Sequence, residues 1–278
     1  MHFRRLEIIS VRNLWVSRPW YLADTMKTLK LKGHVVGLFC HGIWWRGKHL
    51  GLKYSDEEPK IDRHGIAAAD LAIKSNATTL LVSGGCTRPD LYETGVTISE
   101  ATGMKAFMQE SGALGNNLPV VTEDWARDSF ENCLFSMFAA CHATGHYPER
   151  LTVVSWRFKA NRILLVGNAL AIPNFEFVGV ENPDGKNLQH AICAETGYLA
   201  SLVHYQTQTL VDPFHRGSAF EDKRQGRMPP RYKRDSSAYL QDVRAAYPKA
   251  EGIGAAIEAV STLKPGDGWQ AIRWPWQS

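Results

Sequence analysis

The stretch Thr79-Leu80-Leu81-Val82-Ser83-Gly84-Gly85-Cys86-Thr87-Arg88 decides the fold of this chain. Residues suited to a buried strand lead directly into a turn of small residues, and a cation follows the turn. Proteins of the α/β class use this pattern to bring backbone N–H groups close to a ligand. A tight turn after a strand favours glycine in any protein, so the motif needs support from other strand ends.

The composition indicates a globular protein with a large core. The chain has 278 residues, of which 44% are hydrophobic and 22% charged, and a chain of this size buries most of its apolar surface. The net charge of +4 permits a polyanionic partner without requiring one. The five cysteines are widely spaced and form no Cys-x-x-Cys pair, which indicates neither a disulfide framework nor a zinc site.

Targeting signals are not evident in the sequence. No apolar run approaches the roughly 18 residues of a membrane span. The apolar start of the chain is interrupted by Arg12 and Asn13, which makes it too short for the core of a signal peptide. We therefore expect a cytoplasmic protein with no membrane partner.

Strands and helices are expected to alternate through the middle of the chain. Apolar runs predict strands at residues 34–40, 79–83, 118–121, 151–155 and 175–180. Helical spacing predicts helices at residues 63–76, 97–111 and 128–145, with another opening at 157–162. Asp128 and Glu131 stand where the cap of the third helix belongs. This alternation favours a Rossmann-like α/β fold with a doubly wound, mostly parallel sheet.

The two ends of the chain differ from this middle part. Residues 1–33 are interpreted as an N-terminal extension and residues 34–212 as the Rossmann-like domain. The loop from 46 to 59 is polar and expected to be exposed, and a helix is expected at 191–205. Residues 213–278 are expected to form an irregular basic arm, a final helix from 237 to 247 or to 263, and a Trp-rich end that packs on the domain.

The strand ends carry reactive or charged residues, and ligands bind at the carboxyl ends of parallel strands. Four such groups meet there: His41, the 83–88 turn, residues 123–128 and residues 155–162. One crevice would then collect a base, a hydroxyl or thiol, carboxylates and guanidinium groups. No Gly-x-Gly-x-x-Gly or Walker sequence is present, so no nucleotide cofactor is expected. We also expect no metal site.

Several motifs together resemble a known family. They are Leu81 to Gly85, Ser99-Glu100-Ala101, Glu123 with Asp128 to Asn132, and Val153-Val154-Ser155 with Arg162. In order and spacing they resemble the YdcF-like (SanA/ElyC-like) domain of unknown function, over about residues 34 to 181. The resemblance implies a Rossmann-like fold. Bacterial members place a histidine in the fourth motif, where this chain has Phe158 and Lys159.

The Trp-rich ends and residues 126–132 are similar to the fungal branch of that family. The chain is also similar to fungal arginine-containing cyclodipeptide synthases, which use aminoacyl-tRNA. This resemblance implies an aminoacyltransferase of secondary metabolism with aminoacyl-tRNA as partner. A second hypothesis is a YdcF-like protein that either binds a small molecule or nucleotide or acts on it as a hydrolase, without tRNA. A non-enzymatic interaction module is a third.

The candidate residues have structural as well as functional interpretations. Ser83 is either a nucleophile or, because the Gly-x-Ser-x-Gly elbow is missing, a turn serine that contacts the ligand. Cys86 is the better nucleophile if Arg88 stabilises its thiolate, and otherwise it is a loop cysteine. His41 is either a general base or a structural histidine.

The charged candidates divide in the same way. Glu100 and Glu131 have a capping explanation, whereas Glu123 and Asp124 do not and are preferred as ligands of a guanidinium. The cations of 157–162 either hold phosphate or form a solvated helix face.

Under the transferase hypothesis these residues take defined roles. His41, Ser83 and Glu123 are the catalytic candidates, with backbone N–H groups of Gly84 and Gly85 as oxyanion donors. The substrate-binding candidates are Gly84, Gly85, Cys86, Asp124, Asp128, Glu131 and Asn132. The candidates for tRNA or phosphate are Arg88, Arg157, Lys159, Arg162, Lys223, Arg224, Arg227 and Arg231.

Overall fold

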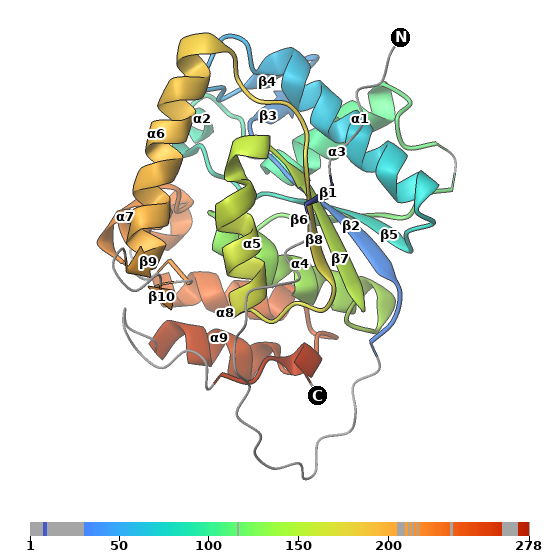
Figure 1. Cartoon of the computed structure of the whole chain (residues 1–278), viewed down its shortest axis with the longest axis vertical. Coiled ribbons are helices and arrows are strands. Elements are labelled where there is room, and N and C mark those ends of the chain that lie inside the picture. The colour runs from blue at the N-terminus through green and yellow to red at the C-terminus, as the bar shows by residue number, and fades with distance from the viewer. Residues whose placement is uncertain are drawn as a thin grey trace.

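The computed structural model describes residues 8–9, 31–115, 117–204, 209–210, 212, 214–215, 217–233, 236–262 and 272–277. Its central sheet has six strands: β1 (Ile8–Ile9), β2 (His34–Phe39), β5 (Thr79–Ser83), β6 (Val120–Glu123), β7 (Arg150–Ser155) and β8 (Phe175–Gly179). They lie in the order β1-β8-β7-β2-β5-β6 (Figure 1). All neighbours are parallel except β1, which pairs with β8 in antiparallel fashion.

The order of the parallel strands is that of a doubly wound sheet. From β2 the chain moves through β5 to β6 on one side, and then returns to β7 and β8 on the other. All five residues of β5 are buried, as is usual for a strand that helices cover on both faces. The expected Rossmann-like α/β fold is confirmed, and its topological switch point lies between β2 and β7.

Helices cover both faces of this sheet (Figure 1). On one face α1 (Glu58–Lys74) and α3 (Glu100–Glu110) share an apolar cluster with β2 and β5. On the other face α4 (Ser129–Thr144) and α5 (Ala160–Ala169) belong to a second cluster. The predicted cap of α4 is present, because the Asp128 carboxylate accepts the Glu131 N–H at 2.9 Å. This cap fixes where the β6–α4 loop ends.

The C-terminal part of the chain adds helices to the α4 side. They are α6 (Gly185–Leu202), α7 (Ser218–Gly226), α8 (Ser236–Ala246) and α9 (Ile253–Thr262). Trp274 and Trp276 belong to the same apolar cluster as α4 and α5, and the Trp276 indole donates to the Leu170 carbonyl at 2.8 Å. Because the sheet and later segments enclose α4, most of its residues are buried, including the continuous run from Cys133 to Cys141.

Of the two ends expected for the final helix, 247 agrees with α8, and α9 follows as a separate helix. Two other expectations for local structure were wrong. The arm from 214 to 235 was expected to be irregular, but α7 and a 3-10 turn (Pro230–Tyr232) lie within it. The supposedly exposed loop from 46 to 59 contains β4 (Lys48–Leu50), which pairs with β3 (Ile43–Trp45) in a hairpin, and its residues His49 and Glu57 are buried. Each of these segments is held by contacts with residues distant in sequence, which local patterns do not reveal.

Shorter elements complete the described structure: α2 (Pro89–Tyr92), β9 (Val203–His204) and β10 (Thr209–Leu210). Most of the predicted N-terminal extension lies outside the described residues, apart from β1 and residues 31–33. Within the described ranges, no helix has the length and apolar character needed to cross a membrane.

Candidate functional site

Two adjoining cavities open near the carboxyl edge of the sheet, and Arg127 lies in the wall of both. We name them the cation-lined cavity and the aromatic cavity. The cation-lined cavity, of about 160 Å³, is bordered by Cys40 and His41 after β2 and by Lys159 after β7. It therefore lies at the topological switch point, where ligands of doubly wound proteins bind.

Cations outnumber carboxylates in the wall of the cation-lined cavity. The cations are Lys53, Arg127, Lys159, Arg162, Lys223 and Arg227, and the carboxylates are Glu57, Glu100, Asp128 and Glu195. Six positive side chains thus face four negative ones, and His41 adds a titratable group. The charge of the cavity depends on which of these groups have partners in the protein.

Arg162 and Glu195 form a buried bidentate pair in this wall. Arg162 Nε donates to Glu195 Oε1 at 2.8 Å and Nη2 donates to Oε2 at 2.9 Å. The third nitrogen, Nη1, donates to the Ser129 hydroxyl at 2.6 Å. All three nitrogens of the Arg162 guanidinium therefore donate to protein groups, and its phosphate-binding role stays a prediction.

The side chain of Asp128 is also bonded to other groups of the protein. Its Oδ2 accepts a hydrogen bond from Arg224 Nη1 at 3.0 Å and lies 3.1 Å from His215 Nδ1. The neighbouring charges of His215 and Arg224 hold the pKa of Asp128 well below its ordinary value, against the effect of burial. Asp128 and Arg224 were predicted to bind substrate and phosphate, but together they tie α7 to the start of α4.

Glu57 orients the His41 ring. His41 Nε2 lies 3.2 Å from Glu57 Oε1, and Glu57 Oε2 accepts the backbone N–H groups of Lys53 and Tyr54 at 2.7 and 3.1 Å. Hydrogen bonds with His41 and the loop lower the pKa of Glu57 although burial opposes the shift. A carboxylate fixed in this way holds one ring nitrogen of His41, as in catalytic dyads.

Four cations of the cavity have no carboxylate partner among the described residues: the exposed Lys53, and Lys159, Lys223 and Arg227. Burial and the nearby Arg162 lower the pKa of Lys159 to about 8. Burial, Arg227 and Arg162 hold the pKa of Lys223 well below its ordinary value. Their charge is therefore uncompensated on one side of the cavity.

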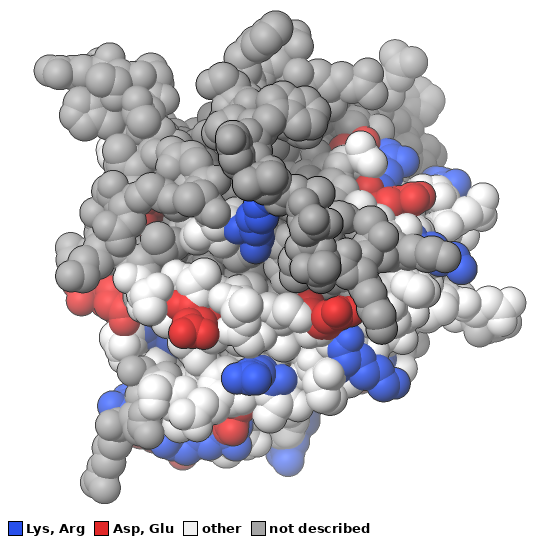
Figure 2. Space-filling model, turned by 90° about the horizontal axis from the view of Figure 1, so that it is seen from below, with Lys and Arg blue, Asp and Glu red and all other residues white. Residues whose placement is uncertain are grey.

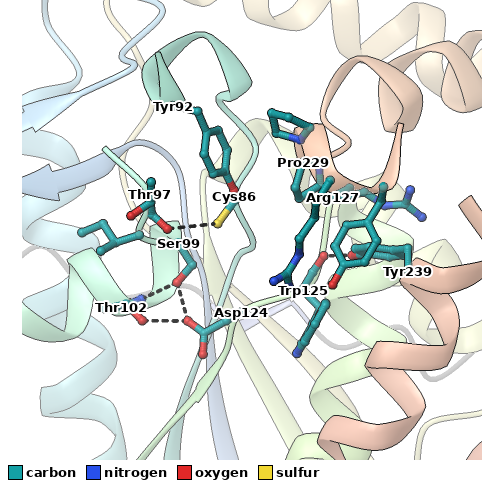
Figure 3. A pocket seen from close by; sticks show the side chains of 14 residues that line it. Cys86, Tyr92, Thr97, Ser99, Thr102, Asp124, Trp125, Arg127, Pro229 and Tyr239 are labelled. Carbon is teal, nitrogen blue, oxygen red and sulfur yellow. Dashed lines mark hydrogen bonds between the residues drawn. The ribbon is translucent and has the colours of Figure 1, made fainter. Parts of the chain in front are cut away.

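The aromatic cavity has about 720 Å³ and mostly apolar walls (Figure 3). One wall carries Cys86, Tyr92 and Asp124, and the opposite wall carries Pro229 and Tyr239 from the C-terminal part (Figure 3). The remaining lining residues are Thr97, Ile98, Ser99, Thr102, Trp125, Arg127, Pro230, Arg231 and Tyr232. Both parts of the chain must therefore be in place for this cavity to exist.

Asp124 is the acidic group of the aromatic cavity. Its Oδ1 accepts hydrogen bonds from the hydroxyls of Ser99 and Thr102, the latter at 2.8 Å. Its Oδ2 accepts no hydrogen bond from the part of the chain that the structure describes. The two hydroxyls fix the carboxylate at the start of α3 and leave one oxygen for a ligand.

Ser83 and Glu123 lie beneath the turn, fully buried and outside the walls of both cavities. The Ser83 hydroxyl donates to Glu123 Oε2 at 2.6 Å and accepts from Asn132 Nδ2 at 2.8 Å. Glu123 Oε1 accepts the N–H groups of Trp125 and Ala126 at 2.7 and 3.0 Å. Burial raises the pKa of Glu123 to about 8, although the hydrogen bonds from Ser83 and Trp125 favour the carboxylate. In this structure both residues brace the β6–α4 loop.

The two turn glycines do not supply oxyanion donors. The Gly84 N–H donates to the Glu123 carbonyl at 3.0 Å, and the Gly85 N–H donates to the Ala126 carbonyl at 2.8 Å. A Cβ on Gly85 would lie 2.8 Å from that same carbonyl oxygen. The glycine at 85 is therefore required by close packing of two loops, which corrects the predicted ligand contact through its N–H.

The other predicted residues have different positions. Cys86 and Arg231 line the aromatic cavity, and Asn132 lines the cation-lined cavity. Glu131 forms a buried pair with Arg127, whose Nε lies 2.9 Å from Glu131 Oε2. Arg88 pairs with Asp90 at 2.7 Å. Arg157 is exposed and lines neither cavity.

Some lining residues escaped the sequence analysis. Glu57 and Glu195 are the partners of His41 and Arg162, and they lie 16 and 33 residues from them in sequence. The aromatic residues Tyr92, Trp125 and Tyr239 carry no motif, and only their contacts with the cavity reveal them. One indication of Glu195 was present in the sequence: it is the only glutamate in the helix expected at 191–205.

The distribution of surface charge does not indicate a further binding site on the described part of the face in Figure 2. On the described part of the face seen in Figure 2, cations and carboxylates are interspersed. No group of three or more His, Cys, Asp or Glu side chains suited to a metal ion occurs in the described ranges. Comparisons with protein-family models, curated proteins and solved structures found no match.

Proposed function

We propose that the protein is an aminoacyl-tRNA-dependent transferase that forms an arginine-containing cyclic dipeptide. The observation that carries the proposal is the Asp124 carboxylate, which lines the aromatic cavity and whose Oδ2 accepts no hydrogen bond from the described residues. A guanidinium is planar and recognises a carboxylate through paired N–H groups, and its face stacks on aromatic rings. Trp125, next to Asp124 in the chain, provides such a ring in the same cavity, and Tyr239 lies in the opposite wall with the Arg127 guanidinium carbon 4.0 Å from its ring centre. Of the three carboxylates expected to bind arginine, Glu123 is sealed and Asp128 is paired, which leaves Asp124.

The reaction needs a base and no redox cofactor. The α-amine of one aminoacyl group attacks the ester carbonyl of the other and loses a proton, and the tRNA of the attacked ester leaves through its 3′ hydroxyl, so that the dipeptide stays on the tRNA of the attacking group. The free amine of the dipeptidyl ester then attacks its own ester carbonyl, closing the ring and releasing the second tRNA. His41 is the group we assign to proton transfer, because Glu57 orients it and part of its side chain is open to the cavity.

Mass spectrometry of metabolites from cells that express the protein tests this proposal. We expect a new arginine-containing cyclic dipeptide, which disappears with Asp124→Ala and persists with the exposed control Asp222→Ala. Absence of any such product from wild-type cells would contradict the proposal. Melting curves of the purified variants must match that of the wild type, so that a lost product reports on the site.

A second candidate function is a YdcF-like protein that binds a phosphate-bearing small molecule without tRNA. The cation-lined cavity favours this candidate, because Lys159, Lys223 and Arg227 line it at the switch point of the sheet, where doubly wound proteins bind ligands. It predicts saturable binding of a phosphorylated metabolite and no arginine-containing product. The two functions are therefore separated by the same metabolite measurement.

A further inference from the structure

We propose that the cation-lined cavity contains a built oxyanion site, in which Lys159, Lys223 and Arg227 hold one phosphate-type group. Lys159 follows β7, and the other two residues come from α7 and its end. The site closes only when the C-terminal part covers the carboxyl edge of the sheet. The inference does not depend on the transferase reaction, because an anion can bind here whatever chemistry follows.

Ion pairs and exposure distinguish these three residues from the other cations of the cavity, since Lys53 has no ion pair in the described structure but is exposed. Arg162 is neutralised by Glu195, and Arg127 by Glu131. Arg227 Nη1 donates to the Arg127 carbonyl, which anchors this side chain and leaves its other N–H groups for a ligand. Neither lysine has a carboxylate within ion-pair distance in the described part of the chain. Apart from the exposed Lys53, the cavity charge without an ion pair is therefore carried by Lys159, Lys223 and Arg227, which lie near enough to influence one another's charge.

An aromatic contact positions Lys223 in the cavity. The Tyr198 ring has Lys223 Nζ at 4.5 Å and the Arg162 guanidinium carbon at 5.3 Å from its centre. A cation–aromatic contact orients an ammonium group without neutralising it. Lys223 is thus positioned while its charge remains available.

Physical chemistry explains why such a wall requires an anion. Cations that approach one another in a partly desolvated cavity repel, and the cost is reduced either by losing a proton or by binding a negative charge. Burial and the neighbouring cations lower the pKa values of Lys159 and Lys223, which corresponds to the first of these responses. A bound dianion would favour the charged lysines and raise both pKa values. Binding must then be accompanied by proton uptake near pH 8.

The cavity size limits the ligand to a single group. A volume of about 160 Å³ accommodates one phosphate-sized oxyanion, whereas the remainder of a larger ligand must extend toward the mouth or the aromatic cavity. The phosphate group can belong to a small molecule or to a phosphodiester of RNA. Both sources share the chemistry that the three cations recognise.

Isothermal titration calorimetry with sulfate tests the site, because sulfate remains a dianion across the relevant pH range. We expect saturable binding at pH 7 that Lys159→Gln and Lys223→Gln each weaken about tenfold or more, as expected for a lost charged hydrogen bond. Lys159→Arg should retain binding within about threefold because the charge is kept. The exposed Lys186→Gln is the matched control and should bind as the wild type does.

The pH dependence of sulfate affinity distinguishes loss of the site from misfolding of a variant. The charged groups that face Lys159 are Arg162, Arg227, Lys223, Glu195 and Glu100. Above pH 8 Lys159 loses its proton, so sulfate affinity should fall by up to about tenfold per pH unit. At pH 8 the binding enthalpy should vary with the ionisation enthalpy of the buffer, which measures proton uptake.

Two results would overturn the proposal. One is the absence of saturable sulfate binding by folded wild-type protein, and the other is equal binding by wild type and both glutamine variants. Parallel titrations with inorganic phosphate and with the dinucleotide cytidylyl-adenosine identify the source of the group, since tighter binding of the dinucleotide indicates an RNA phosphodiester. Because these titrations involve no aminoacyl transfer, they can fail while the proposed reaction stands, and the reverse also holds.

Discussion

The guanidinium of Arg162 and the carboxylate of Glu195 form a two-pronged ion pair between α5 and α6, with N–O distances of 2.8 and 2.9 Å. Both side chains are almost fully buried. A buried pair of this kind is strongly destabilised when one partner is removed, because the remaining charge has no compensation. The pair therefore fixes the wall of the cation-lined cavity more than it recognises a ligand.

We predict that Glu195→Gln lowers the free energy of unfolding by about 3–5 kcal/mol. Urea denaturation at pH 7 measures this change. The exposed Glu93→Gln should alter stability by no more than about 0.5 kcal/mol. Equal stability of the two variants would show that Arg162 finds another partner and that the pair is not structural.

Glu123 should make the stability of the protein depend on pH. Burial raises its pKa from 4.5 to about 8 in the folded state, so between these values the folded protein binds more protons than the unfolded chain. Stability must then fall as pH rises through this window, by up to about 1.4 kcal/mol per pH unit for one group. Glu123→Gln should remove this slope. Urea titrations from pH 5 to pH 8 test it, and parallel curves for wild type and variant would refute the assignment.

The cysteine thiols should differ in reactivity. Burial raises the pKa of the Cys86 thiol above 9.0, which lowers the thiolate fraction at neutral pH. Cys193 is exposed. With iodoacetamide at pH 7.5 we expect Cys193 to be alkylated at least about tenfold faster than Cys86, as followed by peptide mass spectrometry. Faster alkylation of Cys86 would restore it as a candidate nucleophile.

Local pattern was sufficient to predict most of the fold. The apolar run of β5 and the capped, apolar α4 are properties of contiguous sequence, and the sheet follows from their alternation. The helix α7 was not predicted because its sequence from Ser218 to Gly226 is polar. The hydrogen bond from Arg224 to Asp128, a residue 96 positions earlier in the sequence, attaches this helix to the domain.

The site was predicted less completely for the same reason. The strand ends did bring His41, Asp124 and Lys159 to the carboxyl edge. Which charges remain free depends on partners such as Glu195 and Glu131, and sequence patterns do not specify those pairs. Arg162 and Lys159 looked equivalent in the sequence, yet only Lys159 lacks a carboxylate partner in the described structure.

The most direct test of the account follows label from arginyl-tRNA charged with radioactive arginine, in the presence of the other aminoacyl-tRNAs and purified protein. We predict that wild-type protein transfers the label to a small cyclic product and that Asp124→Asn reduces the rate about tenfold or more, because a charged contact with the guanidinium is lost. The exposed Asp222→Asn should match the wild type. No labelled product with folded wild-type protein, or equal rates with Asp124→Asn, would contradict the account.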